Sequence, residues 1–202
     1  MIKKMVKNTF ILTAITLVFG VLLGISYEIT KEPIAKAREA LKQEACRVVM
    51  PEADAFEAYE GFEEKEAESI LQAAKLEDNT IDEVVVASKS GEALGYVITT
   101  TNGKGYGGNI QVSIGISVDG TVTGVQFLSI TETAGLGMNA TKPEFYQQFE
   151  NQNVEQFTVM KQGASGDGEI DAISGATITS NAVTGNVNAA LAYFQDVLKG
   201  GK

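Results

Sequence analysis

The stretch Asp171-Ala172-Ile173-Ser174-Gly175-Ala176-Thr177-Ile178-Thr179-Ser180 runs directly into a segment with helical periodicity. Beyond Ser180, apolar residues recur every three or four positions, which predicts an amphipathic helix with Asn181, Asn186, Asn188, Gln195 and Asp196 mostly on its other faces. Small residues and hydroxyls therefore stand at a helix N-terminus, where backbone N–H groups lack helical partners and the dipole is positive. Such an end binds phosphate readily, and Gly175 lets a backbone come close.

The residues alone leave two interpretations of these hydroxyls open. Ser and Thr are common helix N-caps, and one such hydroxyl stabilises a helix by about 1 kcal/mol. Capping does not require as many hydroxyls as this stretch has. They follow an acid and surround a Gly-Ala pair, at Ser174, Thr177, Thr179 and Ser180. Phosphate binding is therefore the second interpretation.

The order Asp171-x-x-Ser174-Gly175-Ala176-Thr177 resembles the flavinylation signature of the FMN-binding domain. That domain occurs in RnfG of the Rnf complex and in NqrC of the Na+-translocating NADH:quinone reductase. The resemblance implies covalent FMN, with its phosphate esterified to Thr177 and with Ser174, Gly175, Ala176, Thr179 and Ser180 around it. It also implies that a dedicated flavin transferase reads the signature, including Asp171.

Composition narrows the chemistry that the chain can perform unaided. The sequence has no His, which removes Ser-His-Asp catalysis and most zinc and haem ligation, and we expect no catalytic side chain and no metal site. Its one cysteine, Cys46, can form neither an internal disulfide nor an iron–sulfur site. A chain of this kind that transfers electrons needs an organic cofactor.

Charge and hydropathy divide the chain. Residues 9–27 form an uncharged apolar run, long enough at ~1.5 Å per residue to span a ~30 Å hydrocarbon core. Lys3, Lys4 and Lys7 precede it, which predicts a cytoplasmic N-terminus (1–8), a single-pass anchor in the cell membrane and an extracytoplasmic remainder. A cleavable signal peptide is the alternative, although no Ala-x-Ala site follows.

The remainder carries 13 Lys and Arg against 26 Asp and Glu, so we expect no binding of nucleic acid.

Residues 28–80 are expected to be a helical linker region. A helix is predicted from Ile29 to Val49, with Pro33 in its first turn and Met50-Pro51 ending it. The acidic, Ala-rich residues 52–80 predict short helices or a surface excursion. Thr30-x-x-Pro33-Ile34-Ala35 also resembles the segment that follows the anchor in RnfG.

Residues 81–202 predict an α+β domain with a mainly antiparallel sheet. Strands are expected around Val84–Val86 and Leu94–Ile98, joined by a turn at Ser90-Gly91. Residues 110–118 alternate apolar and polar, which indicates a strand with one buried face, and Asp119-Gly120 predicts a hairpin to residues 121–130. A short helix at 142–149, a strand at 157–160 and the final helix follow. The absence of a repeating βαβ pattern argues against a doubly wound nucleotide fold.

Two Gly-rich loops flank this hairpin, at residues 103–108 and 132–137. By themselves they indicate turns. RnfG, by resemblance, has a Gly-Tyr-x-Gly loop and a Glu-Thr-Pro-Gly-Leu-Gly loop at these places, and here Ala134 replaces the Pro. The resemblance implies flavin contacts from Glu132, Thr133, Gly135, Leu136 and Gly137, while Tyr106 either stacks on the flavin or fills the core.

As a whole, the resemblance implies an electron-carrying subunit of an ion-translocating ferredoxin:NAD+ oxidoreductase, with no independent catalysis. The implied partners are the other Rnf subunits, especially RnfD in the membrane, and the flavin transferase. The alternatives are NqrC of the quinone reductase, or a non-redox, membrane-anchored binding or scaffold domain in which Thr177 is only a helix cap.

Overall fold

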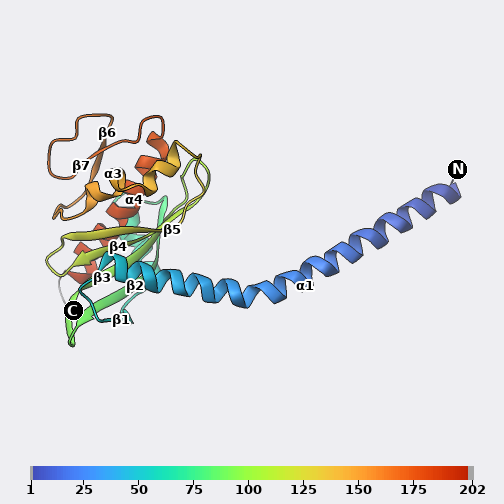
Figure 1. Ribbon diagram of the computed structural model, residues 1–202, viewed down its shortest axis with the longest axis horizontal. Coiled ribbons are helices and arrows are strands. Elements are labelled where there is room, and N and C mark those ends of the chain that lie inside the picture. The colour runs from blue at the N-terminus through green and yellow to red at the C-terminus, as the bar shows by residue number, and fades with distance from the viewer. Residues whose placement is uncertain (1, 200–202) are drawn as a thin grey trace. The chain divides into compact units, whose positions relative to one another are not determined.

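The computed structural model describes residues 2–199. The chain divides into two compact units, with the boundary between Leu41 and Lys42. The expected α+β class is confirmed: Figure 1 shows an N-terminal helix, α1 (Ile2–Val49), and a sheet with helices packed against it. The helix predicted from Ile29 to Val49 is confirmed as the second part of α1. Pro33 was expected in a first turn but lies inside α1, because no turn signal separates Ile29 from the apolar run before it.

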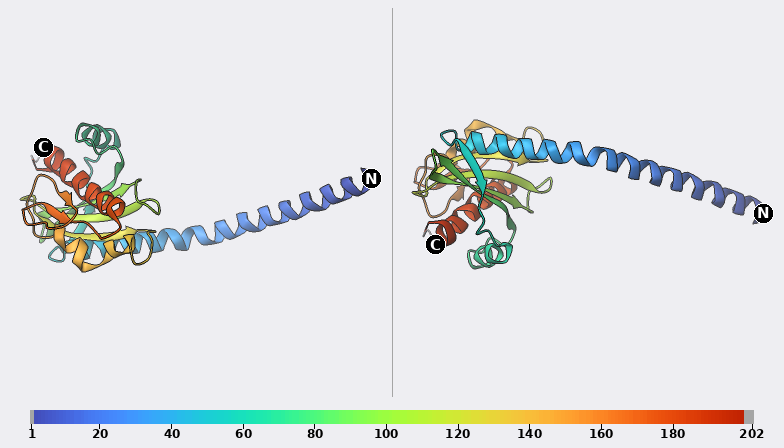
Figure 2. Two further views of the ribbon diagram at one scale, coloured as in Figure 1. Left: turned by 90° about the horizontal axis from the view of Figure 1, so that it is seen from above. Right: turned by 90° about the horizontal axis from the view of Figure 1, so that it is seen from below.

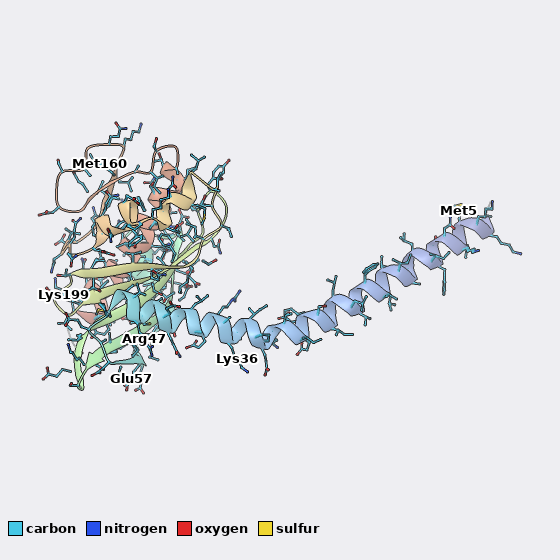
Figure 3. The ribbon with its side chains drawn as sticks, in the orientation of Figure 1. Met5, Lys36, Arg47, Glu57, Met160 and Lys199 are labelled. Atoms are coloured by element: carbon cyan, nitrogen blue, oxygen red, sulfur yellow. The ribbon has the colours of Figure 1, made fainter. Side chains whose placement is uncertain are left out.

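In the first unit, every side chain from Ile2 to Leu41 is exposed. The side chains of Met5 and Lys36 project away from the helix in Figure 3. By length and composition α1 can cross a membrane, and none of its most apolar window is buried within the protein. An apolar surface on all sides of a helix is typical of a segment that packs against lipid or other helices rather than water.

The second unit is built on a five-stranded antiparallel sheet in the order β1-β2-β3-β4-β5. Its strands are β1 (Ala55–Ala58), β2 (Asn79–Lys89), β3 (Glu92–Asn102), β4 (Ile110–Ser117) and β5 (Val122–Ser129). The turns expected at Ser90-Gly91 and Asp119-Gly120 are confirmed, with positive φ at Ser90, Gly91 and Gly120. Strand β1 was not predicted. It is only four residues long, which is too short for an alternation of apolar and polar residues to identify a strand.

One face of the sheet packs on α4 (Thr177–Tyr193) and on α2 (Glu64–Ala73), both visible beside the strands in Figure 2. The apolar stripe predicted for the last helix is confirmed as buried there, and the chain continues into a π-helical turn (Phe194–Leu198). Asn186 was misplaced on the polar side: it is fully buried, and its Nδ2 donates to the carbonyl of Ile110 at 3.0 Å. This bond satisfies the amide nitrogen, while the buried Oδ1 has no hydrogen-bond partner within residues 2–199.

The other face of the sheet is covered by residues 45–50 at the end of α1. The expectation that β4 has one buried face was therefore wrong, since Ser113 and Gly115 are buried as well. Gly115 pairs with Gly124 across the β4–β5 ladder, and a Cβ on Gly115 would lie 2.6 Å from the Val49 carbonyl. The hydroxyl of Thr123 donates to that carbonyl at 2.6 Å and satisfies the helix end.

The segment between β5 and α4, residues 130–176, is built of short elements. It contains η1 (Gly137–Thr141), α3 (Pro143–Tyr146), η2 (Gln147–Phe149), β6 (Thr158–Met160) and β7 (Glu169–Asp171). The predicted helix at 142–149 is thus an α-turn followed by a 3₁₀ turn, and the predicted strand at 157–160 is β6. β6 pairs in parallel with β7, which delivers the chain to the turn before α4.

Candidate functional site

The turn before α4 is held by the hydroxyl of Ser180. This hydroxyl donates to the carbonyl of Ala176 at 3.0 Å and accepts a hydrogen bond from the N–H of Ile173 at 2.9 Å. The N–H of Ala176 closes the same turn on the carbonyl of Ile173 at 2.9 Å. Gly175 has φ +74°, a left-handed conformation that glycine adopts without strain. Ser180 is fully buried, so it shapes the turn from within.

Helix α4 begins at Thr177, and its N-cap residue, Ala176, has no hydroxyl that could cap it. No side-chain hydrogen bond caps this end. The N–H of Ser180 makes the bond to the carbonyl of Ala176 at 3.0 Å, so the N–H groups of residues 177–179 precede the first regular helical bond. Of the two interpretations of the hydroxyls, capping fails here, and the exposed hydroxyl of Thr177 stands beside the positive end of the helix.

The loop 132–137 packs directly against this helix end. A Cβ on Gly137 would lie 2.7 Å from Oε2 of Glu132 and 2.7 Å from Oγ1 of Thr179, so no larger residue fits between them. The carbonyl of Thr133 accepts the N–H groups of Leu136 at 3.1 Å and Met138 at 3.2 Å, which folds the loop into a tight turn. The two stretches that the sequence suggested are therefore in contact.

The loop 103–109 forms another wall, with Tyr106 at its tip. Buried amides hold both its ends: Oδ1 of Asn102 accepts the N–H of Lys104 at 2.8 Å, and Nδ2 of Asn186 donates to the carbonyl of Ile110. Its middle is held by Glu132, whose Oε1 accepts the N–H of Gly107 at 3.2 Å. Tyr106 is 72% exposed and therefore does not fill the core, the second of its two expected roles.

These walls enclose a cavity of about 530 Å³, within the range of small-molecule and cofactor sites. It is lined by Tyr106, Glu132, Thr133, Leu136, Gly137, Gly175, Ala176, Thr177, Ile178 and Thr179. The structure thus brings most of the sequence-predicted site residues together, while Ser174, Gly135 and Ser180 do not line the cavity. Ile178 was not predicted, although its position next to Thr177 at an exposed helix end was a usable signal.

The lining combines an apolar rim with very little charge. Tyr106, Leu136 and Ile178 are large apolar side chains left exposed at this cavity, 72%, 44% and 53% respectively. Glu132 is the one charged side chain among the lining residues, and no Lys or Arg is among them. The site therefore suits a flat, largely apolar group with one anionic end placed at the helix N-terminus.

Asp171 lies outside the cavity, at the end of β7. Its Oδ1 accepts the N–H of Ala164 at 2.9 Å, which ties down the loop before the strand. Its backbone N–H donates to Oε1 of Gln148 at 2.7 Å, and Oε1 of Gln152 accepts the N–H of Gly168 at 2.6 Å. Two glutamines four residues apart thus hold the strand that leads to the site, a role that sequence reasoning missed because side-chain to backbone pairing leaves no pattern.

Comparison with known proteins gives two family matches, the FMN-binding domain over residues 105–192 and the RnfG N-terminal region over residues 1–49. The chain is 33% identical over 199 residues to the G subunit of the Na(+)-translocating ferredoxin:NAD(+) oxidoreductase complex of Acetobacterium woodii, covering 98% of this chain and 95% of that one. It is 31% identical to the G subunit of the proton-translocating complex of Clostridium ljungdahlii, covering 89% and 86%.

Among solved structures, the C subunit of the Na(+)-translocating NADH-quinone reductase of Parabacteroides distasonis is 28% identical, with a TM-score of 0.46 over 62% of this chain and 66% of that one. The matches to the two G subunits run over almost the whole length of both proteins. The chain therefore belongs to the RnfG family, the G subunits of ion-translocating ferredoxin:NAD(+) oxidoreductase (Rnf) complexes.

Proposed function

We propose that this chain is the electron-carrying RnfG subunit of a membrane-bound, ion-translocating ferredoxin:NAD+ oxidoreductase, and that it carries FMN as a phosphoester on Oγ1 of Thr177. The observation that carries the proposal is the position of Thr177: its hydroxyl is exposed in the cavity at the first residue of α4, where it caps nothing. A residue in this place is available for modification and is not needed for the helix.

The charge of the cavity favours an ester over freely bound FMN. A phosphate monoester carries about −1.5 to −2 at pH 7, and the lining residues offer it no Lys or Arg. A phosphodiester carries a single negative charge, which the N–H groups and dipole of the α4 N-terminus can match. Covalent attachment thus lowers the anionic charge that an acidic chain has to accommodate.

The rim residues would hold the flat ring system. Tyr106, Leu136 and Ile178 offer apolar surface for its faces, and Glu132 and Thr133 offer polar atoms for its edge. Bound FMN supplies one- and two-electron transfer, and the chain holds the phosphate, orients the ring and leaves one side of it accessible to partners. No side chain of the site is required to act as an acid or a base.

Membrane attachment and maturation complete the proposal. In this proposal helix α1 is a single-pass anchor. Lys3, Lys4 and Lys7, just before the apolar run, support a cytoplasmic N-terminus and an FMN-carrying unit on the other side of the membrane. The partners are the other proteins of the Rnf complex, with RnfD in the membrane as the neighbour in electron transfer. A flavin transferase attaches FMN and reads Asp171, whose Oδ1 accepts the N–H of Ala164 in the loop before the site.

The test is intact mass and peptide mapping of the full chain, produced together with a flavin transferase. We expect an added mass of FMN minus water on the peptide that contains Thr177, and none in the Thr177→Ala variant. Thr179→Val is the matched control, because it removes the other lining threonine hydroxyl of α4 at nearly the same volume and should keep the added mass. An unmodified wild-type chain under these conditions would refute the proposal.

A further inference from the structure

Strand β5 is one edge of the sheet, and within residues 2–199 backbone pairing on its outer side is confined to the start of the strand. There the N–H of Val122 donates to the carbonyl of Gln152 at 3.0 Å, and the N–H of Asn151 donates back to the carbonyl of Val122 at 2.7 Å. Farther along β5, no other strand within residues 2–199 pairs with this side. The backbone groups on the outer side of the later residues are therefore available to another chain.

A groove of about 530 Å³ follows this uncovered part of the edge. One wall consists of the consecutive residues 126–130, and the other of Thr141 from η1 and Tyr146 from α3. Figure 1 shows the orange segment with α3 next to the yellow-green β5. Five residues in a strand extend about 16 Å at ~3.3 Å per residue. The groove is therefore long enough for a short extended segment to lie beside β5.

The chemistry of the groove specifies an extended peptide without charge. Its lining residues are Gln126, Phe127, Leu128, Ser129, Ile130, Thr141 and Tyr146, none of them ionised at neutral pH. Edge strands are commonly protected against pairing by Lys or Pro, and residues 120–131 contain neither. The half-buried side chains of Phe127, Leu128 and Tyr146 offer apolar contacts beside the free backbone. This combination is the one that strand addition uses.

The position of the groove indicates which peptide it takes. From Ile130 the chain passes directly to Glu132 and Thr133, which line the proposed FMN cavity. A partner paired along β5 is thereby fixed next to the cofactor site, where a protein that exchanges electrons with it has to sit. The β4–β5 ladder shifts at Leu128, between the pairs of Phe127 and Ser129, so that only a short segment can pair.

We infer that the groove beside β5 binds a short, extended, uncharged segment of another protein of the Rnf complex, which adds to the sheet next to residues 126–130. The inference rests on the proposed function for the identity of the partner, but not for the site itself. Strand addition predicts protection of backbone amides, which side-chain docking alone would not produce.

The test is hydrogen exchange of the full chain, measured alone in detergent and in the assembled complex. We expect exchange of the outward-facing amides among residues 126–130, those not already paired with β4, to slow by about tenfold or more in the complex. Strand β1, the opposite edge of the sheet, is the internal reference and should change less. Equal exchange at residues 126–130 in both samples overturns the inference. Slowing that appears in the isolated chain as its concentration rises also overturns it, because the occupant is then a second copy.

Two variants with matched exposure sharpen the test. Ser129→Glu places a charge on an exposed position of the groove, and Ala58→Glu places one on an exposed position of the opposite edge strand. The protection of residues 126–130 in the complex should be lost with Ser129→Glu and kept with Ala58→Glu. Protection that persists in both variants would show that the groove is not the binding site. The flavin content of each sample is read by mass, so that absence of flavin with normal protection refutes the proposed function alone.

Discussion

Ser180 and Ala176 are joined twice, by the N–H of Ser180 and by its hydroxyl, and both bonds reach the same Ala176 carbonyl at 3.0 Å. The hydroxyl also accepts the N–H of Ile173, so one buried serine fixes the turn that presents Thr177. Ser180 therefore supports the proposed attachment residue from behind and does not face the cavity itself. The serine and the threonine of one motif thus have separable roles.

Ser180→Ala should destabilise the protein where Thr177→Ala does not. The alanine leaves the part-buried N–H of Ile173 without its partner, and this costs about 1 kcal/mol, the lower end of the range for buried groups. We expect a lower melting temperature and a reduced yield of covalent flavin, measured by thermal unfolding and by flavin fluorescence on a denaturing gel. Ser174→Ala, at an exposed position of the same turn, is the control. Wild-type stability in Ser180→Ala would show that the turn holds without this hydroxyl.

Asp171 can be tested with two substitutions that separate its contact from its charge. Asp171→Asn keeps an oxygen that can accept the N–H of Ala164, whereas Asp171→Ala removes it. If the transferase reads the negative charge, both variants lose flavin, and only Asp171→Ala loosens the loop 161–168. Mass spectrometry gives the flavin content, and hydrogen exchange of that loop gives its mobility. Full flavinylation of Asp171→Asn would mean that the charge is not recognised.

Much of the fold was predictable because it follows local rules. The apolar stripe of α4, which repeats every 3.6 residues, depends on neighbouring residues only, and so do the turns at Ser90-Gly91 and Asp119-Gly120. The structure confirms all three. The burial of β4 on both faces was not predictable. It depends on residues 45–50 packing at Gly115, more than sixty residues away in sequence, which leaves no trace in the alternation of the strand.

The same distinction applies to the candidate site. The motif around Thr177 and the loop at Glu132 carried their own signals, and they meet in one cavity. Asn102 and Asn186, which hold the ends of the loop with Tyr106, gave no signal, because a buried asparagine is identical in sequence to a surface one. Supporting residues of this kind are visible only once the distances between distant segments are known.

Gly137→Ala should damage the cavity while Gly103→Ala should not. At Gly137 the added methyl would meet Glu132 and Thr179 at 2.7 Å, and both atoms belong to the cavity walls. At Gly103 the nearest atom to such a methyl is the Asp78 carbonyl, at 3.9 Å. We expect a loss of about 1–3 kcal/mol in stability for Gly137→Ala, as for other overpacked sites, together with a changed flavin absorption spectrum. An unchanged spectrum would place the flavin away from Gly137.

Loss of the amide of Asn186 should loosen the loop that carries Tyr106. Asn186→Ala frees the carbonyl of Ile110, the residue at which the loop 103–109 joins β4. We expect faster hydrogen exchange across this loop and a shift in the circular dichroism of bound flavin. Asn181→Ala, on the exposed side of the same helix, is the control. Identical loop exchange in both variants would remove Asn186 from the support of the site.

Tyr193 should make the protein less stable at alkaline pH. Burial, with smaller contributions from Tyr59, Glu66 and Glu63, raises the pKa of Tyr193 from 10.0 to about 12, and its hydroxyl has no hydrogen-bond partner within residues 2–199. Above pH 10 the unfolded chain releases this proton while the folded chain retains it. Stability therefore falls as pH rises towards 12, by up to about 1.4 kcal/mol per pH unit.

Tyr193→Phe removes the titrating hydroxyl and keeps the ring, whose centroid lies 5.9 Å from that of Phe62 in an edge-to-face contact. Because the lost hydroxyl has no partner, the variant should match or exceed the wild type in stability at pH 7. Urea unfolding between pH 8 and 11 should then give a shallower decline for Tyr193→Phe than for the wild type. Parallel declines would mean that the Tyr193 hydroxyl ionises equally readily in the folded and unfolded chains, and so that water reaches it in the folded protein.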